Sequence, residues 1–277
     1  MPVSDGRLPP QVMWHDRRMS DAAADLATLL AGAEHAVVLT GAGISTESGI
    51  PDFRSAGGLW ETYDPMKVAS MSTFMDDPAL FWRFHRPRID MLGAVDPNPA
   101  HEAVAELQRR GIVKAVITQN IDRLHSRAGA VDVIEVHGSL DGGRCIRCSL
   151  AVSMDELCAR ADAAEDGVPR CNCGFQMKSG VVLFGEQLPM EAIEAAYDAA
   201  ERADVMLVIG SSLQVTPVSQ LPGVVLSRGG RLAILTESET DYDHRCTVRI
   251  HEKAGPTMTA MLAALGDSHS PGTVTST

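Results

Sequence analysis

The sequence predicts an α/β protein built on a doubly wound, Rossmann-like parallel sheet, with a helical segment and a small cysteine-containing module inserted into it. Two observations support this prediction. Short β-branched runs, apolar on both faces, alternate with stretches of helical periodicity, as expected for strands that helices cover on both sides. Five of the six cysteines gather in one segment that interrupts this alternation, and four of them form two close pairs.

The runs expected to form strands are 36–40, 112–118, 131–136, 180–184, 204–210 and 231–235. The helices expected between them include Ala100–Arg110, Met190–Arg202 and Pro256–Leu265. A first helix should begin after Ser20, a residue type that favours helix N-caps, and continue to about Ala33. Sheets of this class hold ligands at the carboxyl ends of their strands.

The chain is expected to form one domain between two loosely ordered ends. Residues 1–19 are rich in proline and charge, and residues 266–277 are polar and rich in Gly, Ser and Thr, so both should be flexible or disordered. Within 20–265, we expect a core of 20–63, 99–138 and 180–265, a helical insert at 64–98 and the cysteine module at 139–179.

Composition narrows the classes of function. The net charge of −12 and the pI near 5.1 disfavour direct nucleic-acid binding, which depends on clustered Lys and Arg. No apolar stretch approaches the ~20 residues that span a bilayer, and the N-terminal region lacks the apolar core of a secretory signal. We therefore expect a cytoplasmic protein without membrane contact, whose cysteines are metal ligands or buried thiols. The oligomeric state is unknown at this stage.

The cysteine module has the spacing of a metal site. A C-x2-C pair and a C-x-C pair, with 22 residues between them, are formed by Cys145, Cys148, Cys171 and Cys173. Four thiolates suit tetrahedral Zn²⁺, and because they leave no open coordination position the ion should be structural. Two unrelated pairs of free thiols are the alternative, and the acidic balance disfavours a nucleic-acid-binding zinc ribbon. Cys158 and Cys246 lie outside the pattern.

A glycine-rich turn follows the strand expected at 36–40. Gly41 and Gly43 would let the backbone approach a pyrophosphate and present its N–H groups. The turn is not a dehydrogenase fingerprint, because Thr46 stands where G-x-G-x-x-G requires its third glycine and no acid clearly ends a strand ~20 residues on. From these residues alone, nucleotide binding and an ordinary tight turn both stay open.

Polar residues follow two further predicted strands. His137 closes the run 131–136, and an imidazole pKa near 6.5 suits a general base at neutral pH. Asn120 and Asp122 follow the run 112–118. Position alone leaves a capped structural histidine and ordinary turn residues as alternatives.

At this point a family resemblance becomes specific. The segment GAGISTESGIPDFRSAGGLW (41–60) resembles the signature block of the sirtuins, which are NAD-dependent protein deacylases. The similarity continues in family order through TQNIDRLHSRAG (118–129), EVHGSL (135–140), the cysteine pairs, VVLFGE (181–186) and VIGSSLQVTPVSQLP (208–222). It covers roughly residues 20–265 and implies a catalytic domain with a small inserted zinc-binding module.

The resemblance implies a reaction in which NAD is a co-substrate. The acyl-lysine oxygen attacks the anomeric carbon of the nicotinamide ribose, and nicotinamide leaves. His137 then deprotonates a ribose hydroxyl, which takes the acyl group from the lysine. The products are nicotinamide, O-acyl-ADP-ribose and free lysine, and the partners are proteins that carry acylated lysines.

The resemblance also implies the site residues. The catalytic residues are His137, Asn120 and Asp122. The NAD contacts are Gly41, Ala42, Gly43, Ile44, Asp52, Phe53, Arg54, Gln119, Asn120, Ile121, Asp122, Gly210, Ser211, Ser212, Thr236 and Glu237. Many sirtuins have Asn where this chain has Thr236, so that contact with the adenosine ribose is the one left open. An extended substrate peptide should pair with the segment containing Val182, Phe184, Gly185 and Glu186.

The choice of acyl group follows from two positions of the helical insert. Sirtuins that remove succinyl or malonyl groups carry Tyr-x-x-Arg there, and the matching positions are His85 and Arg88. Half of the carboxylate clamp is missing, so we expect acetyl or another neutral acyl group. Desuccinylation or demalonylation and protein mono-ADP-ribosylation at the same NAD site are the alternatives. A non-enzymatic NAD or ADP-ribose sensor is disfavoured by the intact His137 and TQNID.

Overall fold

The computed structural model of the chain describes residues 19–52 and 58–266. Its centre is a six-stranded parallel sheet in the order β3-β2-β1-β7-β8-β9. The strands are β1 (Ala36–Thr40), β2 (Val113–Thr118), β3 (Ile134–Glu135), β7 (Val205–Ile209), β8 (Arg231–Leu235) and β9 (Val248–Ile250). The strand order reverses direction between β1 and β7, so the predicted doubly wound class is confirmed.

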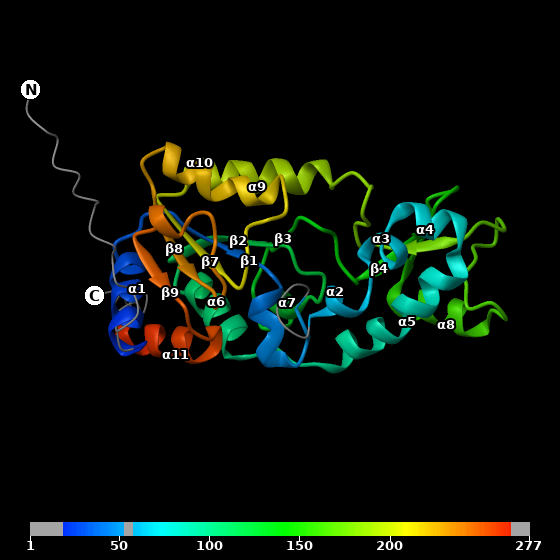
Figure 1. Ribbon diagram of the computed structural model, residues 1–277, viewed down its shortest axis with the longest axis horizontal. Helices are drawn as coiled ribbons and strands as arrows, with labels where there is room; N and C mark the ends of the chain where they lie inside the picture. The colour runs from blue at the N-terminus through cyan, green and yellow to red at the C-terminus, as the bar shows by residue number, and fades with distance from the viewer. Residues whose placement is uncertain (1–18, 53–57, 267–277) are drawn as a thin grey trace, which may run out of the picture.

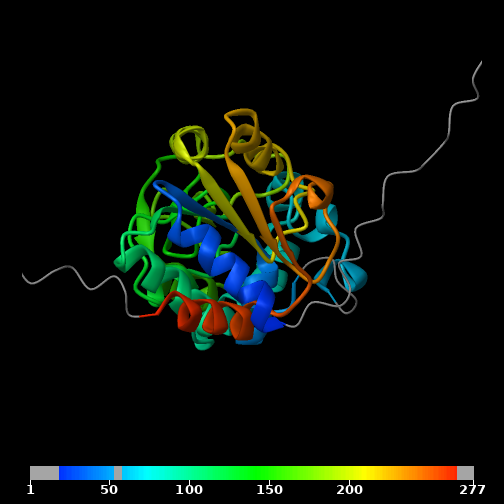
Figure 2. The same ribbon diagram turned by 90° about the vertical axis from the view of Figure 1, so that its left-hand side faces the viewer.

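Helices cover both faces of this sheet (Figures 1 and 2). On one face lie α1 (Met19–Ala31), α6 (Pro99–Arg109) and α11 (Ala254–Leu265), and on the other α9 (Met190–Arg202) and α10 (Leu221–Ser227). Each face has its own apolar cluster. Val38 belongs to the first, whereas Val37 and Leu39 belong to the second, which is why residues 36–39 are all apolar.

A second, smaller sheet lies at the other end of the long axis from α1 (Figure 1). It is antiparallel, with the order β5-β4-β6, and consists of β4 (Gly142–Cys145), β5 (Ala151–Ser153) and β6 (Met177–Ser179). The neighbouring helices are α8 (Met154–Ala163), α2 (Leu59–Thr62), α3 (Pro65–Val68), α4 (Met71–Asp76) and α5 (Pro78–Ala94). A third apolar cluster, which includes Phe81, Trp82 and Leu157, joins α5 to α8 and this sheet.

The remaining elements are short. They are α7 (Leu124–Arg127) and the 3-10 helices η1 (Ala42–Ser48), η2 (Val218–Gln220) and η3 (Asp243–Arg245). Among the described residues, no helix combines the length and apolar character that crossing a membrane requires.

The strand expected at 180–184 is wrong. This run forms no part of either sheet, and within it only Phe184 makes an isolated bridge, to Ser70. Its alternating burial has a different cause: Val181 and Leu183 are buried, while Phe184 is 41% exposed. The run connects the small sheet to the core and packs only one of its faces.

Smaller differences concern element ends. Ser20 lies inside α1, which already includes Met19, so it is not the N-cap. The run 131–136 contributes only the two-residue edge strand β3, and Asp132, whose φ is +49°, lies before it. Strand β9 was not among the predicted runs, since Arg249 interrupts its apolar pattern.

Candidate active site

The glycine turn interlocks with the loop after β7. Gly41 N–H donates to Ile209 O (3.0 Å) and Gly43 N–H to Gly210 O (2.8 Å). A Cβ on Gly43 would lie 2.7 Å from the Cα of Gly210, and a Cβ on Gly210, whose φ is +62°, would overlap with the backbone of Ile44. These glycines are therefore required for two loops to touch at the point where the strand order reverses, and not only for approach to a phosphate.

The residues after β2 form a buried polar network with this turn. The amide of Asn120 donates to Gly41 O and to Ser45 Oγ, both at 3.2 Å. Ser45 Oγ in turn donates to Asp122 Oδ2 (2.7 Å), and the other oxygen of Asp122 accepts from Leu124 N–H (2.9 Å). The structure thus brings together the glycine turn, Asn120 and Asp122 at the carboxyl ends of β1 and β2.

Three members of this network were not predicted. Ser45 lies within the signature block, whereas His101 and His125 lie on helices α6 and α7. His101 Nε2 is 3.4 Å from Ser45 Oγ, and His125 Nε2 is 2.9 Å from Thr40 Oγ1. Burial lowers the pKa of His101 to about 4 and that of His125 to about 3, so both are neutral at neutral pH. The spacing of these two histidines in the sequence gives no signal of their role, and only their contacts in the folded structure reveal it.

Asn98 links helix α6 to the same turn. Its side chain caps the helix by accepting from Ala100 N–H (2.9 Å), and its amide donates to Ile44 O (2.7 Å). One side chain therefore fixes both the start of α6 and the glycine turn.

His137 has a geometry suited to a general base. Its Nδ1 lies 3.0 Å from Gln119 O, and because a carbonyl oxygen only accepts, Nδ1 must carry the proton. The lone pair of Nε2 is then free to accept a proton. Burial lowers the pKa of His137, an effect that the hydrogen bond to Gln119 opposes, so the imidazole is neutral and competent as a base near pH 7.

The neighbours of His137 hold it in place. The side chain of Gln119 donates to Ser211 Oγ (2.8 Å) and so connects β2 to the loop after β7. Gly138 has a φ of +69°, and a Cβ there would overlap with Gly180 O, so only glycine can follow His137 in this arrangement.

The segment expected to bind the substrate peptide lies between His137 and the helical insert. Val182 N–H donates to His137 O (2.8 Å), while Phe184 exchanges backbone hydrogen bonds with Ala69 and Met71 (3.0 and 2.9 Å). Gly185 has a φ of +83°, and Glu186 Oε2 accepts from Leu183 N–H (3.0 Å). The segment is thus placed beside the candidate base.

His85 and Arg88 lie one turn apart on α5 and are both engaged by protein groups. His85 Nε2 donates to Val68 O (3.1 Å), its ring stacks on Phe81 (4.0 Å between centres), and burial lowers its pKa to about 4. The Arg88 guanidinium lies 3.5 Å from the centre of the Phe84 ring and donates to Phe84 O (2.6 Å).

The other predicted NAD residues are placed as follows. Ala42, Ser212, Ile121 and Asp52 are half-buried, Thr236 is buried after β8, and Glu237 is exposed beside it. Phe53 and Arg54 lie outside the described residues.

The four predicted cysteines converge. The Sγ atoms of Cys145, Cys148, Cys171 and Cys173 all lie within 4.8 Å of one another. Two of the pairs, Cys145–Cys173 and Cys148–Cys171, are 3.5 Å apart. A zinc–sulfur distance of about 2.3 Å in a tetrahedron places sulfurs slightly under 4 Å apart, so the cluster fits structural Zn²⁺.

Comparison with known proteins decides the family. The model of the "Sir2 family" matches residues 41–217, which is more than half of the chain. The chain belongs to the Sir2 family.

Relatives of this Sir2-family chain cover most of its length. It is 47% identical over 239 residues to "NAD-dependent protein deacylase 2" of Archaeoglobus fulgidus, covering 86% of this chain and 93% of the relative. It is 45% identical over 237 residues to a "NAD-dependent protein deacetylase" of Caldivirga maquilingensis, covering 85% and 91%. A solved Sir2 structure described with a deacetylated p53 peptide and 3′-O-acetyl ADP ribose has a TM-score of 0.82 and 36% identity, covering 86% and 96%.

Proposed function

We propose that this Sir2-family chain removes acetyl or another neutral acyl group from protein lysines, consuming NAD and releasing nicotinamide, O-acyl-ADP-ribose and free lysine. The observation that carries the proposal is the placement of His137. Its Nδ1 donates a hydrogen bond to Gln119 O, next in sequence to Asn120 and its polar network. The backbone carbonyl of His137 accepts a hydrogen bond from Val182 N–H. The relatives named deacylase and deacetylase support the same reaction.

Different residues of the chain contribute to different parts of this reaction. Bound NAD supplies an anomeric carbon with a departing nicotinamide. The Nε2 lone pair of His137 takes the proton of a ribose hydroxyl, while Asn120 and Asp122, held by Ser45, orient the nicotinamide end. The N–H groups of Gly41, Gly43 and Gly210 already donate to carbonyls of the protein, so the phosphates would be held by neighbouring residues of the same two loops, such as Ala42 and Ser212.

The remaining contacts belong to the same proposal. NAD is contacted by Gly41, Ala42, Gly43, Ile44, Asp52, Phe53, Arg54, Gln119, Ile121, Gly210, Ser211, Ser212, Thr236 and Glu237. The acylated peptide pairs with Val182, Phe184, Gly185 and Glu186, and structural zinc is held by Cys145, Cys148, Cys171 and Cys173.

We further propose that the helical insert (64–98) and the zinc module (139–179) are distinct parts of the catalytic domain, 20–265. The protein acts in the cytoplasm on acylated proteins, without direct nucleic-acid or membrane binding. The net charge of −12 supports this last point, because it disfavours contact with phosphates and anionic lipids.

The test is the variant His137→Ala, assayed with an acetyl-lysine peptide and NAD. Deacetylation should fall at least about a hundredfold, the usual scale for losing a positioned base, while nicotinamide release persists in part. His35→Ala is the matched control, since His35 lies at the opposite end of β1, and it should retain activity. Full turnover by His137→Ala would refute the assignment.

The preference between acyl groups distinguishes deacetylation from the second candidate function, desuccinylation. His85 donates to Val68 O and stays neutral above its pKa of about 4, so a succinyl carboxylate would find only Arg88 as a cationic partner. Losing one hydrogen bond to a charged group costs ~1.5–3 kcal/mol, or roughly ten- to a hundredfold in preference. Acetyl-lysine should therefore have the higher kcat/KM, and a preference for succinyl-lysine would contradict this.

Labelled NAD in the same assay tests the other alternative, transfer of ADP-ribose to the peptide.

A further inference from the structure

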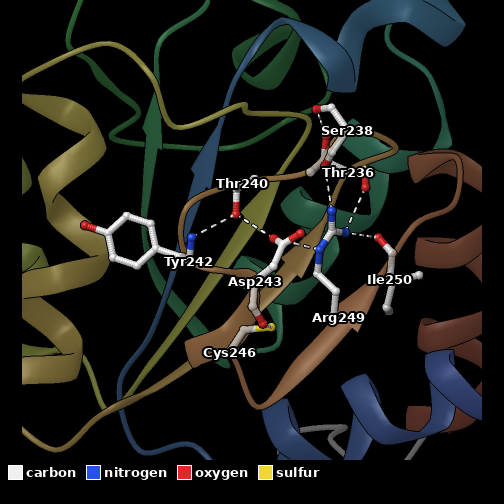
Figure 3. Close-up of polar contacts among 8 residues, drawn as sticks. All are labelled: Thr236, Ser238, Thr240, Tyr242, Asp243, Cys246, Arg249 and Ile250. Atoms are coloured by element: carbon white, nitrogen blue, oxygen red, sulfur yellow. Dashed lines mark hydrogen bonds and ion pairs between the residues drawn. The ribbon is translucent and has the colours of Figure 1, made fainter. Parts of the chain in front are cut away.

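The loop between β8 and β9 is organised around one buried arginine (Figure 3). Arg249, in the middle of β9, has a side chain that is 1% exposed. Its Nη1 donates to the carbonyls of Thr236 (2.8 Å) and Ile250 (2.7 Å). Its Nη2 donates to Ser238 O (2.5 Å). A single guanidinium thus satisfies three main-chain acceptors at the start of the loop and on its own strand.

The end of the loop is fixed to the same guanidinium. Asp243 Oδ1 lies 2.9 Å from Arg249 Nε, forming an ion pair, and also accepts from Thr240 Oγ1 (2.6 Å). Tyr242 N–H donates to Thr240 Oγ1 (3.3 Å), and Cys246 Sγ donates to Asp243 O (3.1 Å). Both halves of the loop are therefore tied to Arg249, one through carbonyls and the other through a carboxylate.

Packing alone does not account for an arginine at this position. The neighbouring residues of β9, Val248 and Ile250, are buried and apolar. A buried charge has to be desolvated, and an apolar residue of similar volume often gives equal or greater stability. What an apolar residue could not do is hold the carbonyls of Thr236 and Ser238 in one arrangement.

The loop lies where the second half of a dinucleotide would extend. Leu235 pairs with Ile209 across β8 and β7, and Gly210 N–H donates to Leu235 O (2.9 Å), so Thr236 is next to the Gly210 loop. His137 and Asn120 lie on the other side of the strand-order reversal, after β3 and β2. If the nicotinamide of a dinucleotide lies beside His137 and Asn120, its pyrophosphate has to cross the ends of β1 and β7. Its adenosine then lies toward β8.

We propose that Arg249, paired with Asp243, is a positioning residue for the adenosine half of NAD. It fixes the backbone at Thr236–Ser238, so that Thr236 and the exposed Glu237 face the adenosine ribose in a preformed arrangement. This inference rests on the proposed function. It assigns to Arg249 an effect on NAD affinity that does not involve contact with the reacting atoms.

The first test is steady-state kinetics of Arg249→Met and Asp243→Asn with an acetyl-lysine peptide. Without the guanidinium, NAD has to order the loop on binding, so KM for NAD should rise roughly tenfold or more. The kcat value and KM for the peptide should change less than about threefold, because His137 and Asn120 lie on the other side of the strand-order reversal from this loop. Arg249→Lys, which keeps the charge but has one nitrogen, should fall between parent and Arg249→Met.

Arg110→Met is the matched control. Arg110 is also largely buried (15% exposed), pairs with Glu106 and donates to a carbonyl, that of Gly266, but it lies at the end of α6, away from the strand ends that hold NAD. It should lower the melting temperature without changing KM for NAD. If Arg249→Met does not fold, Arg249→Lys and Asp243→Asn carry the same comparison.

Calorimetric titration with ADP-ribose separates failure of this inference from failure of the proposed function. Parent protein should bind ADP-ribose, and Arg249→Met should bind it roughly tenfold more weakly. Equal affinity in both, or a fall in kcat with KM for NAD unchanged, would overturn the role of Arg249. Absence of binding to the parent protein would overturn the NAD-dependent function itself, and with it this inference.

Discussion

The two sheets of the molecule are stabilised in different ways. Every residue of β1 and β7 is buried in the six-stranded sheet, between helices on both faces. The small sheet has strands of four, three and three residues, and β5 alternates between exposed and half-buried positions. So small a sheet buries little apolar surface of its own and depends on its cysteine cluster.

The difference matters for the site because its two halves come from the two regions. The glycine turn, Gln119 and the network around Asn120 belong to the six-stranded sheet. The peptide segment follows β6 of the small sheet and reaches His137 through the bond from Val182 N–H. The NAD half should therefore be rigid by packing alone, whereas the peptide half should depend on the metal.

Removing a zinc ligand should give the largest effect. Cys171→Ser should lose the metal, unfold the small sheet and abolish deacylation, because three thiolates cannot complete a tetrahedral site. Hydrogen exchange should then rise in 142–179 while 205–209 stays protected. Metal analysis gives the zinc content directly. Cys158→Ser is the control, since Cys158 lies outside the cluster, and it should keep both metal and activity. Uniform unfolding of both sheets would show that they are one cooperative unit.

Acid should destabilise both regions through buried histidines. The pKa values of His101 and His85 are about 4 and that of His125 about 3 in the folded protein, all below the ordinary 6.5. The unfolded chain therefore takes up protons first, so this stability is complete above pH 6.5 and is lost as the pH falls toward 4. The loss is about 1.4 kcal/mol per pH unit for each histidine.

Urea unfolding at pH 7.5, 6.5 and 5.5 measures this loss. The variant His85→Phe should reduce the pH dependence of the region around the small sheet and leave that of the six-stranded sheet, which contains His101 and His125. A free energy of unfolding that is constant between pH 7 and pH 5 would contradict the buried, neutral state of these rings.

Gly210→Ala tests whether the NAD half is rigid by packing. A methyl group there would overlap with the backbone of Ile44 at a φ of +62°, so we expect a loss of ~2–4 kcal/mol from overpacking and left-handed strain. Gly93→Ala is the matched control, because a Cβ in that helical position meets no atom within 4 Å. It should be neutral or stabilising by up to ~1 kcal/mol. Thermal melting compares the two, and equal melting temperatures would contradict the loop contact.

The smallest effect should come from the connection between the two regions. Lys178 of β6 is buried, donates to Val181 O (2.5 Å) and pairs with Glu186 (3.1 Å) at the peptide segment. Lys178→Met should raise KM for the peptide roughly fivefold, for a loss of about 1 kcal/mol, with zinc retained. The exposed Lys114 gives the control Lys114→Met. An unchanged KM would show that the segment is held without this ion pair.

Local sequence was sufficient for much of the fold. The runs 36–40 and 231–235 and the helix Met190–Arg202 have the predicted bounds, because burial on one or two faces imposes a period that the sequence displays. The run 180–184 misled because its continuous apolar sequence resembles a buried strand, but its hydrogen bonds go to Ala69 and His137. The pattern of apolar residues indicates which side chains are buried, but it does not indicate which groups their backbone N–H and C=O will hydrogen-bond.

The sequence by itself determined the family, the metal-ligand spacing of the cysteines and the parallel sheet, since each depends on residue identity at fixed separations along the chain. The tertiary structure decided the rest. Ser45 meets His101 across 56 positions and Arg249 meets Thr236 from a different strand, so neither contact has a signature in linear spacing. The proton on His137 Nδ1 is likewise set by a carbonyl 18 positions away. These contacts exist only because strand ends that are distant in sequence are brought to one edge of the sheet.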